Sequence, residues 1–129
     1  MKPYVANIEQ ETLSNEYFRK EIFTGEYLQI TVMSLLPGEE IGAETHPHTD
    51  QFLRIEQGSG TAIIGGQEYA ITDDFAVTIP AGQLHNIVNT GEIPMKLYSI
   101  YTPPEHPMGT IHKDKTEAEA AEAAHHAVR

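Results

Sequence analysis

Residues 80–89 read Pro80-Ala-Gly-Gln-Leu-His85-Asn-Ile-Val-Asn89. Pro80 and Gly82 are turn residues, and the residues that follow, His85–Asn89, predict a strand. Alternate side chains of a strand point to the same face, so His85 and Ile87 share one face. We expect this to be the interior face, where an imidazole is costly unless another group satisfies it. The stretch therefore predicts a strand whose first residue brings a polar ligand into an apolar core.

Short strands recur on both sides of this stretch. Gly65–Gly66 predicts a tight hairpin, because a type I′ turn needs positive φ at both central residues. Strands of this length with glycine turns between them indicate an all-β sandwich or barrel. No repeat or linker divides the chain, so we expect an N-terminal segment with a first strand (1–27), a barrel core (28–102) and a C-terminal loop and helix (103–129). The predicted core strands are Leu28–Leu36, Gln51–Glu56, Thr61–Ile64, Gln67–Ile71, Phe75–Ile79, His85–Asn89 and Met95–Tyr101.

The composition excludes several classes of function. The 129 residues include 19 acidic and 8 basic ones, which give a net charge of −11. We therefore expect no nucleic-acid partner and no anionic membrane surface as a partner, because both need clustered Lys and Arg. The chain has no cysteine, which rules out disulfides, thiolate catalysis and Fe–S clusters. Its N-terminus has no apolar stretch of signal-peptide length, and we expect a cytoplasmic protein.

Two segments resemble the motifs of the cupin family. Residues 80–89 match the second cupin motif, P-x-G-x-x-H-x-x-x-N, at all four fixed positions. The family usually has a glycine six residues before this proline, where Asp74 stands here. The first motif is G-x5-H-x-H-x3–4-E-x6-G, and its glycines set the register. That register runs through Gly38, Glu44, His46, Gln51 and Gly58, so a glutamate replaces the first histidine and a glutamine replaces the glutamate.

The resemblance implies a double-stranded β-helix, the jelly-roll barrel of small single-domain cupins, with a site for one divalent metal ion. By position, the implied ligands are Glu44, His46, Gln51 and His85. Two imidazoles and one carboxylate are the ligand type of non-haem Fe(II) oxygenases, and Mn²⁺ also suits mixed nitrogen and oxygen donors. The expected metal is therefore Fe or Mn, whereas Zn or Ni would bind if that ion is the more abundant one. In a barrel without metal, the four side chains would hydrogen-bond to each other or to water.

Three further histidines are candidate catalytic residues. His48 follows Pro47 at the expected rim of the barrel, where it would be a substitute ligand or a proton carrier. His106 and His112 lie after the last core strand in a proline-rich segment. If this segment folds back over the barrel mouth, both imidazoles reach the substrate as acid or base groups. If it does not, the segment is an exposed connector to the C-terminal tail.

These observations predict a metal-binding small cupin, an enzyme that acts on a small polar metabolite. The small cupins that the chain resembles are often described as mannose-6-phosphate-isomerase-like, so a sugar-phosphate isomerase is an alternative. An isomerase needs a phosphate anchor, and alternation points Arg54 outward and leaves Lys96 with an undecided face. A non-catalytic binding or sensor module for a small molecule is the third interpretation, because one fold supports many functions.

The C-terminal tail differs in composition from the barrel core. The tail predicts a short helix, with a capping box from Thr116 to Glu119 and alanine-rich sequence to Ala127.

We also expect a homodimer, which the resemblance implies. Phe52 and one of the two apolar rows of residues 95–101 must face outward, and the resulting patch would be large for a monomer. The alternative is that the N-terminal segment covers this patch within one chain.

Overall fold

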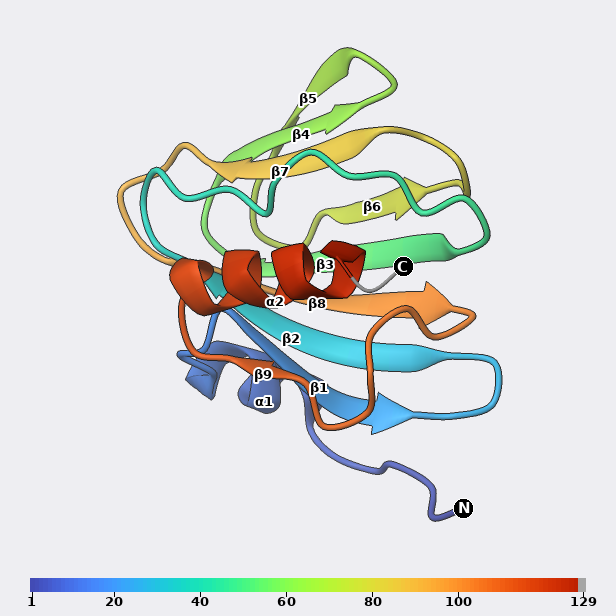
Figure 1. Cartoon of the computed structure of the whole chain (residues 1–129). Helices are drawn as coiled ribbons and strands as arrows, with labels where there is room; N and C mark the ends of the chain where they lie inside the picture. The colour runs from blue at the N-terminus through green and yellow to red at the C-terminus, as the bar shows by residue number, and fades with distance from the viewer. Residues whose placement is uncertain (128–129) are drawn as a thin grey trace.

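The strands form two facing antiparallel sheets that make a barrel (Figure 1). The computed structural model describes residues 1–127. Within them, a six-stranded sheet has the order β6-β3-β8-β2-β1-β9, and a three-stranded sheet has the order β5-β4-β7. The strands are β1 (Arg19–Thr24), β2 (Gln29–Leu35), β3 (Asp50–Gln57), β4 (Gly60–Ile64), β5 (Gln67–Ile71), β6 (Ala76–Ile79), β7 (His85–Asn89), β8 (Met95–Thr102) and β9 (Ile111–His112). The prediction of an all-β jelly-roll barrel is confirmed.

Side chains of the large sheet alternate between the barrel interior and the outer face. On β3, Gln51, Leu53 and Ile55 are buried, and the residues between them are partly exposed. This pattern matches the predicted alternation of Gln51–Glu56. On β8 the interior row is Met95, Leu97, Ser99 and Tyr101, each at most 1% exposed, so Tyr98 and Ile100 form the outer row.

The interior of the barrel is polar at one end and apolar at the other. At one end Gln51, Tyr101 and Gln29 lie opposite one another on β3, β8 and β2. At the other end the same three strands place Ile55, Leu97 and Met33 side by side. The apolar residues supply the core that stabilises the fold. The polar end is therefore where a ligand can be bound without disturbing that core.

Two turns have the backbone conformation that their sequences predict. Gly65 and Gly66 connect β4 and β5 with φ of 57° and 84°, as a type I′ hairpin requires. Asp74, which takes the place of a family glycine, has φ of 70°. Its carboxylate accepts a hydrogen bond from Arg54 on the outer face of β3. Asp tolerates the left-handed region better than most residues, so this substitution keeps the turn.

Two helices cover parts of the barrel. Helix α1 (Ile8–Ser14) precedes β1, and Lys96 of β8 donates a hydrogen bond to the Asn15 carbonyl just after this helix. The N-terminal segment thus covers one end of the outer face. Phe52 and Tyr98, whose rings are 6.4 Å apart, remain partly exposed. None of the helices in residues 1–127 has the length and apolar character needed to cross a bilayer.

Helix α2 (Lys115–Ala127) begins slightly before the predicted capping box. Asp114 Oδ1 accepts from the Glu117 backbone N–H, and Glu117 Oε1 accepts from the Lys113 N–H. The capping residues are therefore Asp114 and Glu117, and the prediction of Thr116 and Glu119 is wrong by two positions. Asp is a better cap than Thr, which favours this register. Ala118 is 6% exposed and belongs to the hydrophobic core, so the helix docks on the barrel.

Candidate metal centre

The backbone brings Glu44 and His85 together although they lie 41 positions apart in the sequence. Each donates its N–H to the carbonyl of the other, both at 3.0 Å. A pair that exchanges both hydrogen bonds places its two side chains next to each other on one face of the sheet. His46, two residues after Glu44, is held by a hydrogen bond from the Gly82 N–H to its carbonyl, 2.9 Å. The two motif segments are thus tied together by backbone hydrogen bonds.

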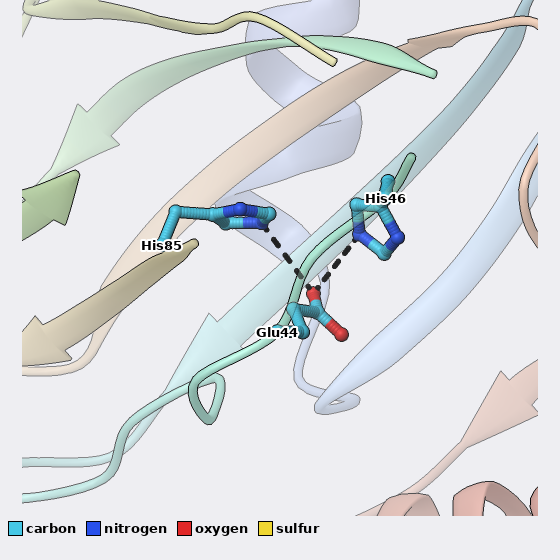
Figure 2. A group of neighbouring side chains, drawn as sticks. All are labelled: Glu44, His46 and His85. Atoms are coloured by element: carbon cyan, nitrogen blue, oxygen red, sulfur yellow. Dashed lines mark ion pairs between the residues drawn. The ribbon is translucent and has the colours of Figure 1, made fainter. Parts of the chain in front are cut away.

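The side chains of Glu44, His46 and His85 converge on one point (Figure 2). One carboxylate oxygen of Glu44 lies 3.3 Å from His46 Nε2 and 3.8 Å from His85 Nε2. One ligand atom from each residue lies within 4.8 Å of the other two. Both imidazoles are buried, with 7% exposure for His46 and 3% for His85, whereas Glu44 is partly exposed. We call these three residues the triad.

The outer ring nitrogens of both triad histidines are already bonded. His85 Nδ1 lies 3.0 Å from the Gln83 carbonyl, which can only accept, so Nδ1 carries a proton and Nε2 is the nitrogen left for a metal ion. His46 Nδ1 lies 3.1 Å from a carboxylate oxygen of Glu105. Such partners on the far nitrogen orient metal-binding histidines and raise their basicity. Both rings therefore direct Nε2 toward the centre of the triad.

The carboxylates control the protonation of His46. Burial lowers the pKa of His46, but Glu105 and Glu44 outweigh burial and raise it to about 9. Burial raises the pKa of Glu44, yet His46, Arg19 and His85 bring it below its ordinary value. Without a metal ion, His46 is protonated on both ring nitrogens at pH 7: Nδ1–H faces Glu105, and the Nε2 proton, at the centre of the triad, faces Glu44. A cation at the centre would take the place of that proton.

The donor atoms fit a divalent metal ion. His85 Nε2 and Gln51 Oε1 are buried without a hydrogen-bond partner among the described residues, and the buried His46 Nε2 faces the Glu44 carboxylate at 3.3 Å. Ligand atoms about 2.1 Å from one metal are about 3.0 Å apart at right angles and about 3.4 Å apart in a tetrahedron. The distances of 3.3 and 3.8 Å within the triad are close to this range. Buried polar atoms without partners cost stability, and a metal ion would satisfy them together.

The fourth predicted ligand, Gln51, faces the same interior. It is 4% exposed and lies directly opposite Tyr101 on β8. The Tyr101 ring is also an edge-on neighbour of His46, with centroids 6.0 Å apart. The Gln51 amide donates to Ser99 Oγ at 3.4 Å, which leaves its Oε1 available. Gln51 thus offers a neutral oxygen to the interior face that it shares with Tyr101, the ring neighbour of His46.

The segment after β8 folds over the polar end of the barrel. Gln29, which is fully buried, donates to the His106 carbonyl at 2.7 Å and accepts from the N–H groups of Glu105 and His106. We call residues 103–110 the mouth loop. This path brings Glu105 to His46 and puts the His106 ring edge-on to Tyr101, with centroids 5.1 Å apart. The expectation of a loop over the mouth describes this segment, and the alternative of an exposed connector does not.

The three candidate catalytic histidines lie in different places. His106 is at the mouth, and its Nε2 is buried without a hydrogen-bond partner in the described part of the chain. Burial lowers its pKa to about 3, and Arg19 acts in the same direction. His112 lies on β9, where its Nδ1 is 3.2 Å from Arg19 Nη1. His48 is exposed and outside the triad, so its position gives no support for a role as ligand or proton carrier.

Two residues near the triad were not identified from the sequence. Glu105 lies beside His106 in a segment without regular structure, and no periodicity indicated where it points. Arg19 is the first residue of β1, where a run of charged residues hides the alternation, and it is 6% exposed. The sequence analysis searched for an anchoring cation at Arg54 and Lys96. Arg54 is on the outer face as expected, Lys96 is in the outer row of β8, and the interior cation is Arg19.

Comparison with known proteins identifies the family and the fold. A family model described as the cupin domain matches residues 31–101. The chain belongs to the cupin family. This cupin is 50% identical over 127 residues to Uncharacterized protein YrkC of Bacillus subtilis (strain 168), with 94% of this chain and 68% of YrkC covered.

Solved structures show the same fold. The crystal structure of BH2720 from Bacillus halodurans superposes on this cupin with a TM-score of 0.91 and 50% identity, covering 92% of this chain and 95% of that one. The structure of TT1209 from Thermus thermophilus has a TM-score of 0.67 and 21% identity, covering 77% and 96% of the two chains. The second likeness concerns the fold alone.

Proposed function

We propose that this cupin is a metal-dependent enzyme that acts on a small polar metabolite inside the barrel mouth. The observation that carries the proposal is the convergence of two buried imidazole nitrogens on one carboxylate oxygen. Glu44, His46 and His85 would hold the metal, and Gln51 would supply a further oxygen. The bound metal would supply Lewis-acid polarisation of a substrate oxygen or, as iron, redox chemistry with dioxygen.

The donor set favours Fe(II) or Mn(II). Two imidazoles and one carboxylate leave positions open for a substrate, as in the facial triads of non-haem iron enzymes. An amide oxygen such as that of Gln51 is a hard, neutral donor, which suits these ions better than the nitrogen- and sulfur-rich sites preferred by structural zinc. Zn or Ni would still load where it is abundant, because affinity rises along the series toward copper.

Residues of the mouth would form hydrogen bonds with the substrate. Because burial holds the pKa of His106 at about 3, its imidazole is neutral at pH 7 and can accept a hydrogen bond. Burial also raises the pKa of Tyr101 to about 12, so its hydroxyl stays protonated and can donate. The mouth loop covers these groups and limits the access of water.

Metal analysis tests the ligand assignment. The purified chain, dialysed and reloaded with Mn²⁺, should bind about one ion per chain by elemental analysis, as expected for a single preformed site. His85→Ala should lose most of the metal, whereas the exposed His48→Ala serves as the matched control and should keep it. Full loading of the double variant Glu44→Ala/His85→Ala would overturn the assignment. Loss of metal in His48→Ala but not in Glu44→Ala would mean that the register of the first motif is wrong by two residues.

A sugar-phosphate isomerase remains a second candidate, because Arg19 supplies an interior cation that could hold a phosphate group. Turnover assays with Fe(II), Mn(II) and Zn(II), under air and under nitrogen, distinguish the chemistries. Conversion of a hexose phosphate without oxygen would favour the isomerase, and oxygen consumption with an organic substrate would favour the oxygenase. Tight binding of a metabolite without turnover would instead favour a sensor module.

A further inference from the structure

One carboxylate of the mouth loop contacts the segment that carries two of the triad residues. Glu105 Oε1 lies 3.1 Å from His46 Nδ1, and Glu105 Oε2 accepts a hydrogen bond from Thr49 Oγ1 at 3.2 Å. His46 and Thr49 are both buried, with 7% and 4% exposure, and they lie three positions apart just before β3. Both oxygens of this carboxylate are therefore bonded to the first-motif segment.

The other hydrogen bonds that the mouth loop makes to the rest of the described chain go to β1 and β2. Gln29 of β2 binds the backbone of Glu105 and His106. At the far end of the loop, Glu21 of β1 accepts from the Gly109 N–H at 2.9 Å. Within residues 1–127, Glu105 is thus the residue through which the mouth loop bonds to a triad side chain.

This contact places a carboxylate, an imidazole and the expected metal position in a row. His46 has Glu105 at its Nδ1 and the centre of the triad at its Nε2. A carboxylate on the far nitrogen fixes the orientation of a metal-binding imidazole and strengthens it as a ligand. A divalent ion also carries a larger charge than the proton that it would displace, so the anionic Glu105 favours the loaded state. Opening of the loop would remove both effects.

Coupling of this kind is reciprocal. If the closed loop raises the affinity for the ion by a given factor, the ion must favour the closed loop by the same factor. We propose that Glu105 is a positioning residue that couples metal binding at the triad to closure of the mouth loop. The closed loop holds His46 in the orientation that the ion needs, and the bound ion holds Glu105, and with it the loop, over the polar end of the barrel. Metal occupancy then controls entry to the barrel interior.

The inference rests on the proposed function for the metal, so metal binding and loop opening are measured separately. The probe is Co²⁺, which suits nitrogen and oxygen donors and reports on its ligands through visible absorbance and shifted NMR signals. Glu105→Ala removes the carboxylate, and Glu105→Gln keeps the hydrogen-bonding shape without the charge. Glu21→Ala is the matched control, because Glu21 also holds the mouth loop, at Gly109, but is not part of the triad.

The affinity and the hydrogen exchange should change by matching factors. Glu105→Ala should weaken Co²⁺ binding by about tenfold to a hundredfold and Glu105→Gln by less, whereas Glu21→Ala should change it little. In the wild-type chain, Co²⁺ should slow exchange of the Glu105 and His106 amides by the factor that Glu105→Ala loses in affinity. The Phe18 amide, which bonds to the Lys113 carbonyl, reports general stabilisation. In Glu105→Ala the ion should slow the His106 amide no more than the Phe18 amide.

Proton NMR of the Co²⁺-loaded chain gives a readout that a purely structural role of Glu105 would not change. The Nδ1 protons of His46 and His85 should each give a shifted, exchangeable signal, because both rings would bind the ion through Nε2. Glu105→Ala should expose the His46 proton to water and remove its signal by exchange. The His85 proton, bonded to the Gln83 carbonyl, should keep its signal. Glu105→Gln should restore the His46 signal, because its amide oxygen still accepts a hydrogen bond.

Several outcomes would overturn the inference. Equal Co²⁺ affinity in folded Glu105→Ala and wild type would do so and would leave the proposed metal function intact. Equal slowing of the His106 and Phe18 amides in the loaded wild-type chain would also do so. If circular dichroism shows that Glu105→Ala does not fold, Glu105→Gln decides: reduced affinity and reduced loop protection support the coupling, and wild-type values refute it. If the wild-type chain binds no Co²⁺, the inference and the proposed metal function are both wrong.

Discussion

Replacement of Gln29 by methionine should detach the mouth loop from the barrel. The Gln29 side chain makes four hydrogen bonds, three to the backbone of Glu105 and His106 and one to Thr24 Oγ1. Methionine has a similar length and volume but cannot make these bonds. The loop then either keeps its place with unsatisfied buried groups or lifts toward water. Lifting is cheaper, because an unsatisfied buried group costs about 1–3 kcal/mol.

The size of the effect follows from the bonds to the loop. At about 1 kcal/mol for each net hydrogen bond, the three loop bonds contribute about 3 kcal/mol to closure. Opening should therefore become roughly 100-fold more frequent, because each 1.4 kcal/mol is a factor of ten. Hydrogen exchange of the Glu105 and His106 amides measures this opening directly. Release of Glu105 from His46 should also weaken Mn²⁺ binding by about tenfold to a hundredfold, as losses of such outer partners do.

Gln57→Met is the matched control. Gln57 is also partly buried, but its amide makes one bond, to the Pro94 carbonyl at 3.0 Å, and none to the mouth loop. Gln57→Met should lower the free energy of unfolding, measured by urea denaturation, by about 1 kcal/mol. It should leave hydrogen exchange of the Glu105 and His106 amides unchanged. If Gln29→Met leaves the His106 amide as protected as in wild type, the loop is held by other contacts and the reasoning is refuted.

Three further predictions concern the site and the surface. In the metal-free chain, NMR should show His46 titrating near pH 9. Because this pKa lies above the ordinary value, protonated His46 stabilises the metal-free fold fully below about pH 6.5, and this contribution is lost as the pH rises to about 9. Metal binding should tighten over the same pH range, because the ion replaces a proton on His46. Absorbance at high pH should show Tyr101 ionising near pH 12, above the ordinary pKa of a tyrosine. The fold should lose stability between about pH 10 and 12, and Tyr101→Phe should remove that phase. Light scattering should give a dimer that Phe52→Glu weakens; a monomeric wild type would contradict the proposed homodimer, and a dimer unaffected by Phe52→Glu would place its interface elsewhere.

The sequence was enough to predict the barrel because two kinds of local signal agree. Alternation on β3 and β8 separates interior from exterior, and Gly65–Gly66 marks a hairpin by its conformational requirement. The spacing of the outer glycines of the first motif selected Glu44 and His46 over the more conspicuous pair His46 and His48. These positions depend on regular backbone, where residue spacing determines the direction of a side chain.

The rest of the site depends on tertiary contacts that spacing does not encode. Glu105 reaches His46 because Gln29, more than seventy residues away, binds the mouth loop. The direction of Arg19 depends on its pairing with β2 and β9, since the charged residues of β1 give no clear alternation. The capping error at Thr116 has a local cause, because Asp114 and Thr116 are both acceptable caps and Asp is the better of the two.

The pairing of Glu44 with His85 has a consequence for a chain that contains no cysteine. An ion held by His46 and His85 would close a loop of about 40 residues, as a disulfide between those positions would. On the chain-entropy relation for cross-links, a closed loop of that length is worth about 4 kcal/mol, a large share of the stability of a small domain. The bound ion would then be a reversible cross-link between the two motif segments. A chelator should therefore lower the melting temperature, and local unfolding should begin between these segments.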